Sequence, residues 1–261
     1  MDLTKGIPII KYDNGMVLPL EDMVVKEYAL TIMLDGEEFI TLLCTPSSLD
    51  CLTVGFLLSE SIIKSKSDIK RIRIDEEKGI AEVSTIESSM IAKNLHGKRT
   101  MTTGCGKGST FYNAVDSISC RKIMGSMEID AKAILELMRD FNKRSELFMN
   151  TGGVHSVALG TDTDIMLFHE DVGRHNAMDK IVGEASLKDI ELSDKIVLTS
   201  GRVSSEMLIK AAKAQIPVIV SRSAPTDLAV ELASQLGITV IGFARGQRMN
   251  IYSNPERIKF Q

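Results

Sequence analysis

The chain has 261 residues, of which 44% are hydrophobic and 25% are charged, a balance typical of a globular protein with a sizeable core. Its formal net charge of -4 argues against a general binder of nucleic acid or of anionic membranes, but it is compatible with a local basic pocket. No apolar run approaches the ~20 residues of a membrane span, and the N-terminus holds too short an apolar stretch for a signal peptide. We therefore expect a cytoplasmic protein whose four cysteines, Cys44, Cys51, Cys105 and Cys120, are reduced.

The N-terminal half contains two hairpin patterns around one helical pattern. Residues 27–46 alternate apolar and polar side chains around Asp35-Gly36, a strong signal for a hairpin turn. Residues 69–86 repeat this alternation around a Glu-Lys-Gly turn, and residues 49–63 between them have a roughly helical period. These patterns predict a small ββαββ unit of the α+β type.

The segment 87–109 has no clear period and ends in TTGCGKGS, where Cys105 lies among glycines and near Lys107. We interpret it as a connector with a mobile tip. The nucleophilic form of cysteine is the thiolate, and a nearby lysine or helix N-terminus lowers the pKa of a thiol. Ser109 can cap such a helix, and the glycines let the backbone approach a bulky partner. The pattern predicts a reactive thiol on a flexible arm; the alternative is an incidental cysteine in an exposed loop.

From residue 126 onward, strand patterns alternate with helical ones. Asp130 can cap a helix over residues 131–148. The patterns that follow are strands at 151–160 and 164–171, a helix at 172–185, a strand at 195–201, a helix at 204–215, a strand at 217–222, a helix at 225–237 and a strand at 239–245. Strands joined by single helices pair in parallel through right-handed crossovers. We therefore expect a layered α/β domain at residues 126–261, after a smaller domain at residues 1–125.

Arginines follow the ends of these predicted strands. The residues concerned are Arg174 with His175, Arg202, Ser221 with Arg222, and Arg245. Ligands of open parallel sheets bind beyond the carboxyl ends of the strands. A single arginine after a strand is commonly a solvated loop residue, but four at one sheet edge can hold phosphates, guanine edges or carboxylates. We expect a polar, anionic ligand there.

Some polar residues of this half also have purely structural interpretations. Asp171, Arg174 and Asp179 can form a capping and salt-bridge set at the start of a helix. His155, in Thr-Gly-Gly-Val-His, has the spacing of a half-buried histidine that is satisfied by its neighbours.

Several well-known chemistries do not fit the sequence. A Walker A loop fails because Met101 occupies its first glycine position and Lys107 is followed by glycine. Zinc nucleobase deaminases require a Cys-x-x-Cys motif, which is absent from the chain. No metal site is predicted.

A resemblance to a known family rests on particular stretches of the sequence. They are TPSSLDCLTVGFLLSESII, TTGCG, TGGVHSVAL, EDVGRHNAMDKIVG, the long stretch from Ser200 to Tyr252, and PERI. In these stretches, over nearly its whole length, the chain resembles the FdhD/NarQ family, the accessory sulfurtransferases of formate dehydrogenase. EDVGRHNAMDK and the long C-terminal stretch are the most specific to that family.

The resemblance implies a sulfur carrier. A cysteine desulfurase would hand a sulfane sulfur to Cys105, which matches the carrier position. The protein would then deliver the sulfur to a molybdenum or tungsten bis-pterin guanine dinucleotide cofactor before its insertion into the formate dehydrogenase apoenzyme. Family members commonly have Cys-x-x-Cys at this place, whereas this chain has Gly108 as the last residue of the motif. A persulfide on one thiol is compatible with that difference, and a disulfide with the second cysteine is not.

The resemblance also implies a homodimer and, in the C-terminal half, a cytidine-deaminase-like fold without the zinc ligands. The segment 243–248 matches the stretch that the family associates with its cofactor. The residues expected to bind the cofactor are Phe243, Ala244, Arg245, Gly246, Gln247, Arg248, Arg174, His175, Arg202, Ser221 and Arg222. One alternative is a chaperone for the pterin cofactor without sulfur chemistry, which the missing second cysteine favours. Another is a guanine-nucleotide enzyme, although no motif places a metal or an attacking water.

Overall fold

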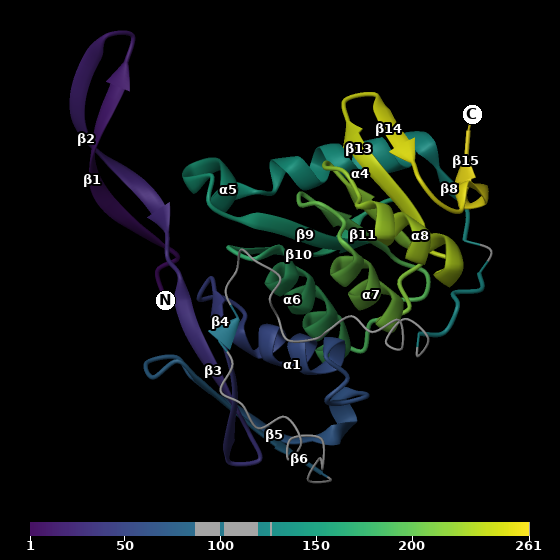
Figure 1. Ribbon diagram of the computed structural model, residues 1–261, viewed down its shortest axis with the longest axis horizontal. Coiled ribbons are helices and arrows are strands. Elements are labelled where there is room, and N and C mark those ends of the chain that lie inside the picture. The colour runs from purple at the N-terminus through teal and green to yellow at the C-terminus, as the bar shows by residue number, and fades with distance from the viewer. Residues whose placement is uncertain (87–99, 102–119, 126, 261) are drawn as a thin grey trace.

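The computed structural model describes residues 1–86, 100–101, 120–125 and 127–260, and it is a mixed α/β structure (Figure 1). Its hydrophobic cores fall in two regions of the chain. One core is built from residues 30–83, and two further cores, on opposite faces of one sheet, are built from residues 123–258. The fold class expected from the sequence is confirmed, and the domain boundary at residue 125 stays a prediction.

The first core belongs to the predicted ββαββ unit. Its elements are β3 (Tyr28–Leu34), β4 (Glu37–Cys44), α1 (Leu49–Ser59), η1 (Lys66–Asp68), β5 (Ile69–Asp75) and β6 (Ile80–Thr85). Asp35 and Gly36 both have positive φ, 51° and 90°, as the predicted hairpin turn requires. The sheet order is β5-β6-β3-β4-β7, where β7 is Thr100–Met101, and α1 buries Leu52 and Phe56 against it. The two hairpins are joined by a parallel pairing of β3 with β6.

A further hairpin precedes this unit and projects from the body of the molecule (Figure 1). It consists of β1 (Thr4–Asp13) and β2 (Met16–Val25), paired along their full length. The turn between them is Asn14-Gly15, with φ of 49° and 86°. The sequence analysis did not predict this hairpin, although Asn-Gly is the strongest local signal for such a turn.

The C-terminal half forms a six-stranded sheet in the order β10-β9-β11-β12-β13-β14. Its strands are β9 (His155–Gly160), β10 (Ile165–Asp171), β11 (Ile196–Thr199), β12 (Val218–Ser221), β13 (Thr239–Arg245) and β14 (Arg248–Ile251). The predicted parallel pairing is confirmed for β11, β12 and β13. The prediction is wrong for β10 and β11, which α6 joins, because β9 lies between them and pairs antiparallel with both. The edge strand β14 also pairs antiparallel, with β13.

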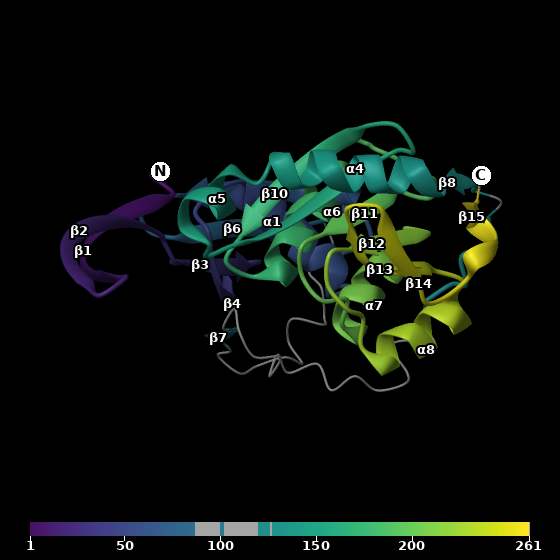
Figure 2. The same ribbon diagram turned by 90° about the horizontal axis from the view of Figure 1, so that it is seen from above.

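Helices cover both faces of this sheet (Figure 2). On one face lies α4 (Ala131–Lys143), which buries Phe141 against the strands. On the other face lie α6 (Arg174–Leu187), α7 (Ser205–Lys213) and α8 (Asp227–Leu236). The remaining elements are α5 (Glu146–Thr151), η2 (Pro255–Arg257) and a parallel pair of β8 (Ile129–Asp130) with β15 (Ile258–Lys259). In the described ranges, no helix combines the length and the apolar character needed to cross a membrane.

The single helix predicted over residues 131–148 is wrong at its C-terminal end, where the chain forms two helices. Asp130 caps the first helix, α4, as predicted. The helix then breaks at Ser145, whose buried hydroxyl lies 3.0 Å from that of Ser156. The first amides of α5 donate to the carboxylate of Glu170, which belongs to a strand distant in sequence. These tertiary hydrogen bonds outweigh the local helical period.

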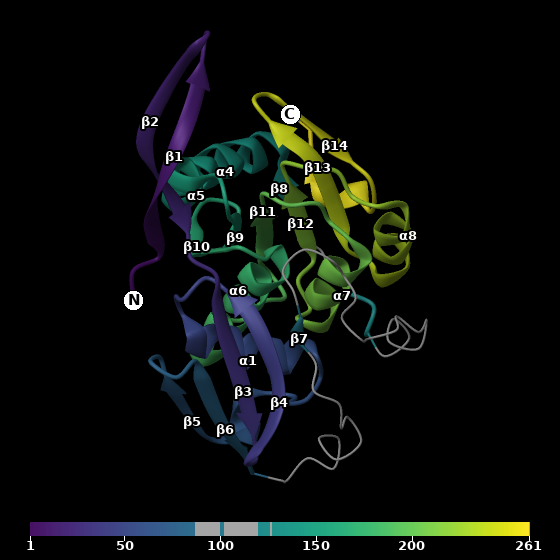
Figure 3. The same ribbon diagram turned by 60° about the vertical axis from the view of Figure 1, so that its left-hand side comes forward.

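The two regions meet where α1 packs against α6 (Figure 3). The helices touch through two glycines. A Cβ atom on Gly55 would lie 1.8 Å from the carbonyl oxygen of Asp179, and one on Gly183 would lie 1.9 Å from that of Cys51. Any larger side chain at either glycine would overlap backbone atoms, so the close approach of the helices requires glycine.

Two buried ion pairs lie beside this contact. Lys180 pairs with Asp171 at 2.7 Å, and both side chains are fully buried. Asp171 also accepts a hydrogen bond from the backbone amide of Thr45 in the N-terminal unit. Lys210 pairs with Asp179 at 2.6 Å. The structural interpretation of Asp171 and Asp179 is therefore supported, since Asp171 binds Thr45 and Asp179 accepts from the Ser59 hydroxyl at 2.7 Å, both in the N-terminal unit.

Candidate functional site

A cleft of about 540 Å³ lies at the edge of the six-stranded sheet where β11, β12 and β13 end and β9 begins. It is lined by Phe148, Gly152, Gly153, Val154, His155, Val172, Ser200, Arg222, Ser223, Phe243 and Arg245. This is the edge at which parallel strands present ligand-binding residues. Its volume suits a small-molecule ligand.

Two of the predicted arginines, Arg222 and Arg245, lie in this lining together. They follow the adjacent parallel strands β12 and β13, so the sheet itself brings them to one edge. The hydroxyls of Ser200 and Ser223 add polar groups to the same wall. Guanidinium groups bind phosphates and carboxylates through paired N–H donors. The cleft therefore has the chemistry of a site for a polar anion.

His155 also lines the cleft, although its spacing in the sequence favoured a structural role. Burial lowers the pKa of its imidazole, and the positive charges of Arg174 and Arg202 lower it further. The ring is therefore neutral at pH 7 and can both donate and accept a hydrogen bond. Its Nδ1 lies 3.5 Å from the hydroxyl of Ser200. No signal in the sequence indicates this placement, because the predicted strand begins at residue 151, whereas β9 begins at His155, at the edge of the cleft.

Phe243 is held in the cleft by an irregularity in β13. Its φ of 52° lies in the left-handed region, which an aromatic residue rarely adopts. The register between β13 and β14 shifts between Gly242 and Arg245, and the Phe243 amide donates to the carbonyl of Ser223 at 3.1 Å. Bulges and strained residues of this kind cluster at binding sites. A half-buried aromatic ring that lines the cleft beside arginines suits a planar ring that carries phosphates.

Two predicted ligand contacts are buried in the wall behind the lining. The side chain of Ala244 is fully buried, and so is that of Ser221. The Ser221 hydroxyl donates to the carbonyl of Gly201 at 2.7 Å and accepts from the amide of Ser223 at 2.9 Å. Ser221 therefore shapes two of the loops that form the cleft.

The turn that follows β13 lies outside the lining of the cleft. It contains the predicted residues Gly246 and Gln247, and Arg248 begins β14 directly after it; all three are exposed, and none of them lines the cleft. Gly246 has a φ of 62°, which fits a tight turn. Their expected contact with a ligand stays a prediction.

The other predicted residues, Arg174, His175 and Arg202, lie next to the cleft wall. A Cβ on Gly201 would lie 3.2 Å from Cδ of Arg174 and 3.4 Å from Nδ1 of His155, so these side chains meet at the end of β11. Burial lowers the pKa of Arg174, and so does the nearby charge of Arg202. His175 is half-buried, and its pKa falls to about 3 because of burial and the charges of Lys210 and Arg174.

Three of the four cysteines, Cys44, Cys51 and Cys120, lie among the described residues. Cys105, the predicted carrier, lies outside the described residues. Burial raises the pKa of the Cys44 and Cys51 thiols to about 12, so neither is a thiolate at neutral pH. Cys120 is half-buried. Within the described ranges, no three side chains from His, Cys, Asp and Glu are grouped to hold a metal ion.

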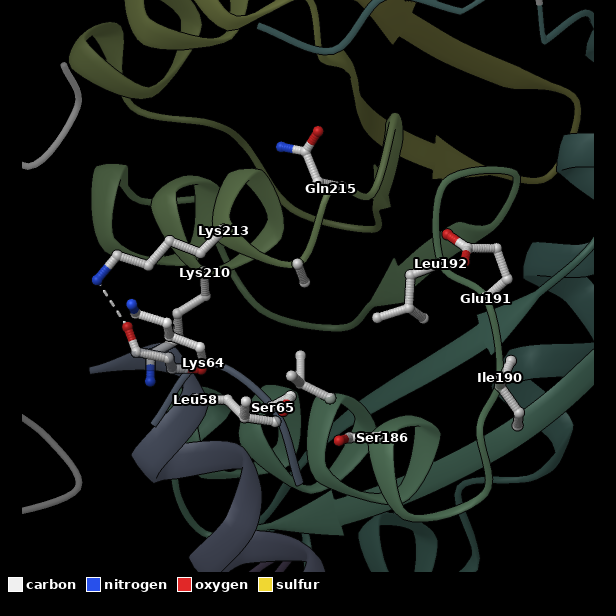
Figure 4. Close-up of a pocket in the computed structure, with 13 residues that line it drawn as sticks. Leu58, Lys64, Ser65, Ser186, Ile190, Glu191, Leu192, Lys210, Lys213 and Gln215 are labelled. Carbon is white, nitrogen blue, oxygen red and sulfur yellow. Dashed lines mark hydrogen bonds between the residues drawn. The ribbon is translucent and has the colours of Figure 1, made fainter. Parts of the chain in front are cut away.

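A second cavity, of about 340 Å³, lies between the end of α1 and the helices α6 and α7 (Figure 4). Apolar side chains such as Leu58 and Leu192 share its lining with Lys64, Lys210 and Lys213. The Lys213 ammonium donates to the carbonyl of Ser59 at 2.8 Å, and Lys210 is paired with Asp179. None of the residues predicted to bind a ligand lines this cavity, so the arginine-lined cleft is the candidate site.

The fold and the cleft together define a class: an α/β protein in which an N-terminal α+β unit packs against a mixed sheet with an arginine-lined site at its edge. Comparison with known proteins gives the family. The FdhD/NarQ family model matches residues 25–259, and the chain belongs to that family. The resemblance on which the sequence analysis relied is thereby confirmed.

Similar proteins cover nearly the whole chain. The "Sulfur carrier protein FdhD" of Bacillus licheniformis is 42% identical over 259 residues, which are 99% of this chain and 98% of that one. The protein of the same name from Geobacillus kaustophilus is 44% identical over 97% of each chain. A crystal structure of a putative formate dehydrogenase accessory protein from Desulfotalea psychrophila matches with a TM-score of 0.81 and 25% identity, covering 99% of this chain and 100% of that one.

Proposed function

We propose that this protein is a sulfur carrier for the maturation of formate dehydrogenase. It takes sulfur from a cysteine desulfurase onto Cys105 and delivers it to a molybdenum or tungsten bis-pterin guanine dinucleotide cofactor. The observation that carries this proposal is an arginine-lined cleft in a chain that matches proteins named as sulfur carriers over almost its full length.

The cleft accounts for the binding of the cargo. Arg222 and Arg245 hold phosphates of a guanine dinucleotide, and the ring of Phe243 stacks on the guanine. Ser200 and the neutral imidazole of His155 supply hydrogen bonds to the polar edges of the ligand. Binding at the edge of the sheet leaves the pterin end of the cofactor free to extend beyond the cleft.

The first chemical step is thiol–persulfide exchange. The Cys105 thiolate attacks the outer sulfur of the persulfide on the desulfurase, a new S–S bond forms on Cys105, and the desulfurase cysteine leaves as a thiolate. Electrons balance within this step, because one S–S bond replaces another. Lys107 favours the attacking thiolate over the thiol.

Release of the sulfur as sulfide requires two electrons. A Cys-x-x-Cys motif can provide them by closing a disulfide, but this chain has Gly108 in the second position. We therefore assign the reduction to two external thiols. The first attacks the Cys105 sulfur of the persulfide, so that sulfide leaves and a mixed disulfide forms on Cys105; the second attacks the external sulfur of that mixed disulfide, and the two external thiols leave joined as a disulfide. The Cys105 thiolate is regenerated for the next cycle.

The proposed setting is the cytoplasm, and the proposed assembly is a homodimer that meets the desulfurase and the formate dehydrogenase apoenzyme in turn. The missing second cysteine also suits a chaperone that binds the cofactor without carrying sulfur. Complementation of a strain that lacks its own carrier separates the two. The Cys105→Ala variant should fail to restore formate dehydrogenase activity, whereas full restoration would favour the chaperone.

GDP is a direct probe of cargo binding. Loss of a charge-assisted hydrogen bond costs ~1.5–3 kcal/mol, so Arg222→Gln and Arg245→Gln should each weaken GDP binding by about tenfold or more in isothermal titration calorimetry. Arg144→Gln is the matched control, because Arg144 pairs with Asp140 on the exposed surface of α4. Unchanged GDP affinity in both cleft variants would contradict the assignment of the site.

A further inference from the structure

Three cationic or polar side chains lie together behind the wall of the cleft, where α6 and α7 begin. Arg174 and His175 are the first two residues of α6, and Arg202 lies just before α7. The Arg174 side chain lies beside Gly201, the residue before Arg202, where an added Cβ would be 3.2 Å from Cδ of Arg174. His175 is close enough to Arg174 for that charge to lower its pKa. None of the three belongs to the lining of the cleft.

The charges of this cluster are poorly balanced. Arg174 and Arg202 are close enough for the charge of one to lower the pKa of the other. Among the described residues, the carboxylate that acts on Arg174 is that of Glu206, in the first turn of α7. Arg174 is half-buried and Arg202 is exposed, and two guanidinium groups beside this carboxylate give a positive potential that favours an anion.

Several buried polar atoms of the cluster have no hydrogen-bond partner among the described residues. They are Nε of Arg174, a donor, and the two ring nitrogens of His175, of which the neutral imidazole has one as a donor and the other as an acceptor. Nε2 of His175 lies 3.1 Å from the Glu206 carboxylate, but it is not aligned for a hydrogen bond. Buried polar atoms without partners are uncommon in native proteins, and each calls for an explanation. A bound group with several acceptor oxygens would satisfy them.

The start of α6 points to the same conclusion. Its N-cap residue is Gly173, which has no side chain to accept from the first amides of the helix. By contrast, α7 is capped by the hydroxyl of Ser204 and α8 by that of Thr226. The first amides of α6 therefore have no side-chain cap from the N-cap residue, and the N-terminus of a helix attracts an anion.

We propose that Arg174, Arg202 and His175 form an inner site that binds a phosphoryl group, separate from the two arginines of the cleft. A tetrahedral oxyanion fits best, because its oxygens can accept from a guanidinium fork, an imidazole N–H and a helix amide at once. The inference deepens the proposed function, since a cofactor with two guanine dinucleotides carries more phosphate than Arg222 and Arg245 can hold. Its source can be that cargo or free phosphate.

Inorganic phosphate and GDP serve as probes, with affinities measured by calorimetry on the full chain in a phosphate-free buffer. Wild type should bind phosphate, and Arg174→Gln and Arg202→Gln should each weaken that binding by about tenfold or more. The Arg144→Gln variant should bind phosphate as wild type does, because Arg144 pairs with Asp140 on the exposed surface. If the cleft variants lose phosphate and the inner variants keep it, or if wild type binds none, the inner site is refuted.

A variant that improves binding guards against loss through misfolding. Glu206→Gln removes the carboxylate that opposes the cluster, so it should tighten phosphate binding severalfold. If Glu206→Gln unfolds at the same temperature as wild type and its affinity for phosphate is unchanged or lower, the result counts against the inner site. A competition experiment identifies the source of the phosphoryl group. If the site holds a phosphate of the cargo, GDP should displace inorganic phosphate and guanosine should not. If the protein binds phosphate but not GDP, the proposed cargo is refuted and the inner site is still supported.

Discussion

The contact between α1 and α6 predicts that Gly183→Ala destabilises the protein by about 3 kcal/mol. The new Cβ would lie 1.9 Å from the Cys51 carbonyl oxygen, whereas Cβ contacts below 3.4 Å are already tight, so the helices must separate by roughly 1.5 Å. A gap of that size removes most of the van der Waals attraction across the contact. The gain in helix propensity from glycine to alanine, about 1 kcal/mol, offsets only part of this cost.

The assay is urea denaturation followed by circular dichroism, with calorimetry to detect separate unfolding of the two regions. Gly125→Ala is the matched control, because Gly125 is exposed and an added Cβ there meets nothing within 4 Å. If the free energy of unfolding of Gly183→Ala lies within about 1 kcal/mol of that of Gly125→Ala, the reasoning from backbone contact is refuted.

Other predictions concern the site and the thiols. Because the native pKa of His175 is about 3 and the unfolded value is near 6.5, its contribution to stability is full above pH 6.5 and is lost as the pH falls. At pH 5 the loss of stability is about 2 kcal/mol. The denaturation midpoint of His175→Gln should therefore decline less than that of wild type between pH 7.5 and 5. A decline as steep as that of wild type would contradict this. Phe243→Gly should weaken GDP binding about tenfold through lost stacking without lowering the melting temperature, because glycine tolerates the φ of 52°; unchanged affinity would remove the ring from the site. In native protein, iodoacetamide should leave Cys44 and Cys51 unmodified while it alkylates Cys105, as peptide mapping can show; rapid labelling of Cys44 would contradict its burial.

The sequence was most informative where local pattern and topology agree. Alternation around Asp35-Gly36 and strands joined by single helices were sufficient to predict the ββαββ unit and the parallel core of the sheet. Because β12 and β13 are parallel neighbours, the positions of Arg222 and Arg245 after them predicted their meeting in the cleft. These are the cases in which strand direction alone determines which residues meet.

Other features depend on tertiary contacts that leave no local signal. The break at Ser145 depends on Glu170 from another strand, and the φ of Phe243 depends on a bulge in β13. Nothing in the sequence distinguishes Gly55 and Gly183 from other helix glycines, because their role depends on the contact between the two helices. The N-terminal hairpin escaped prediction because apolar residues occupy both of its faces, which hides the usual alternation.

Mass spectrometry of the intact protein tests the central claim of sulfur carriage most directly. The protein is incubated with a cysteine desulfurase and cysteine, and its mass is measured before and after treatment with a thiol reductant. Wild type should gain one sulfur atom on the peptide that contains Cys105 and lose it on reduction, whereas Cys105→Ser should gain none. Equal labelling of wild type and Cys105→Ser would contradict the account.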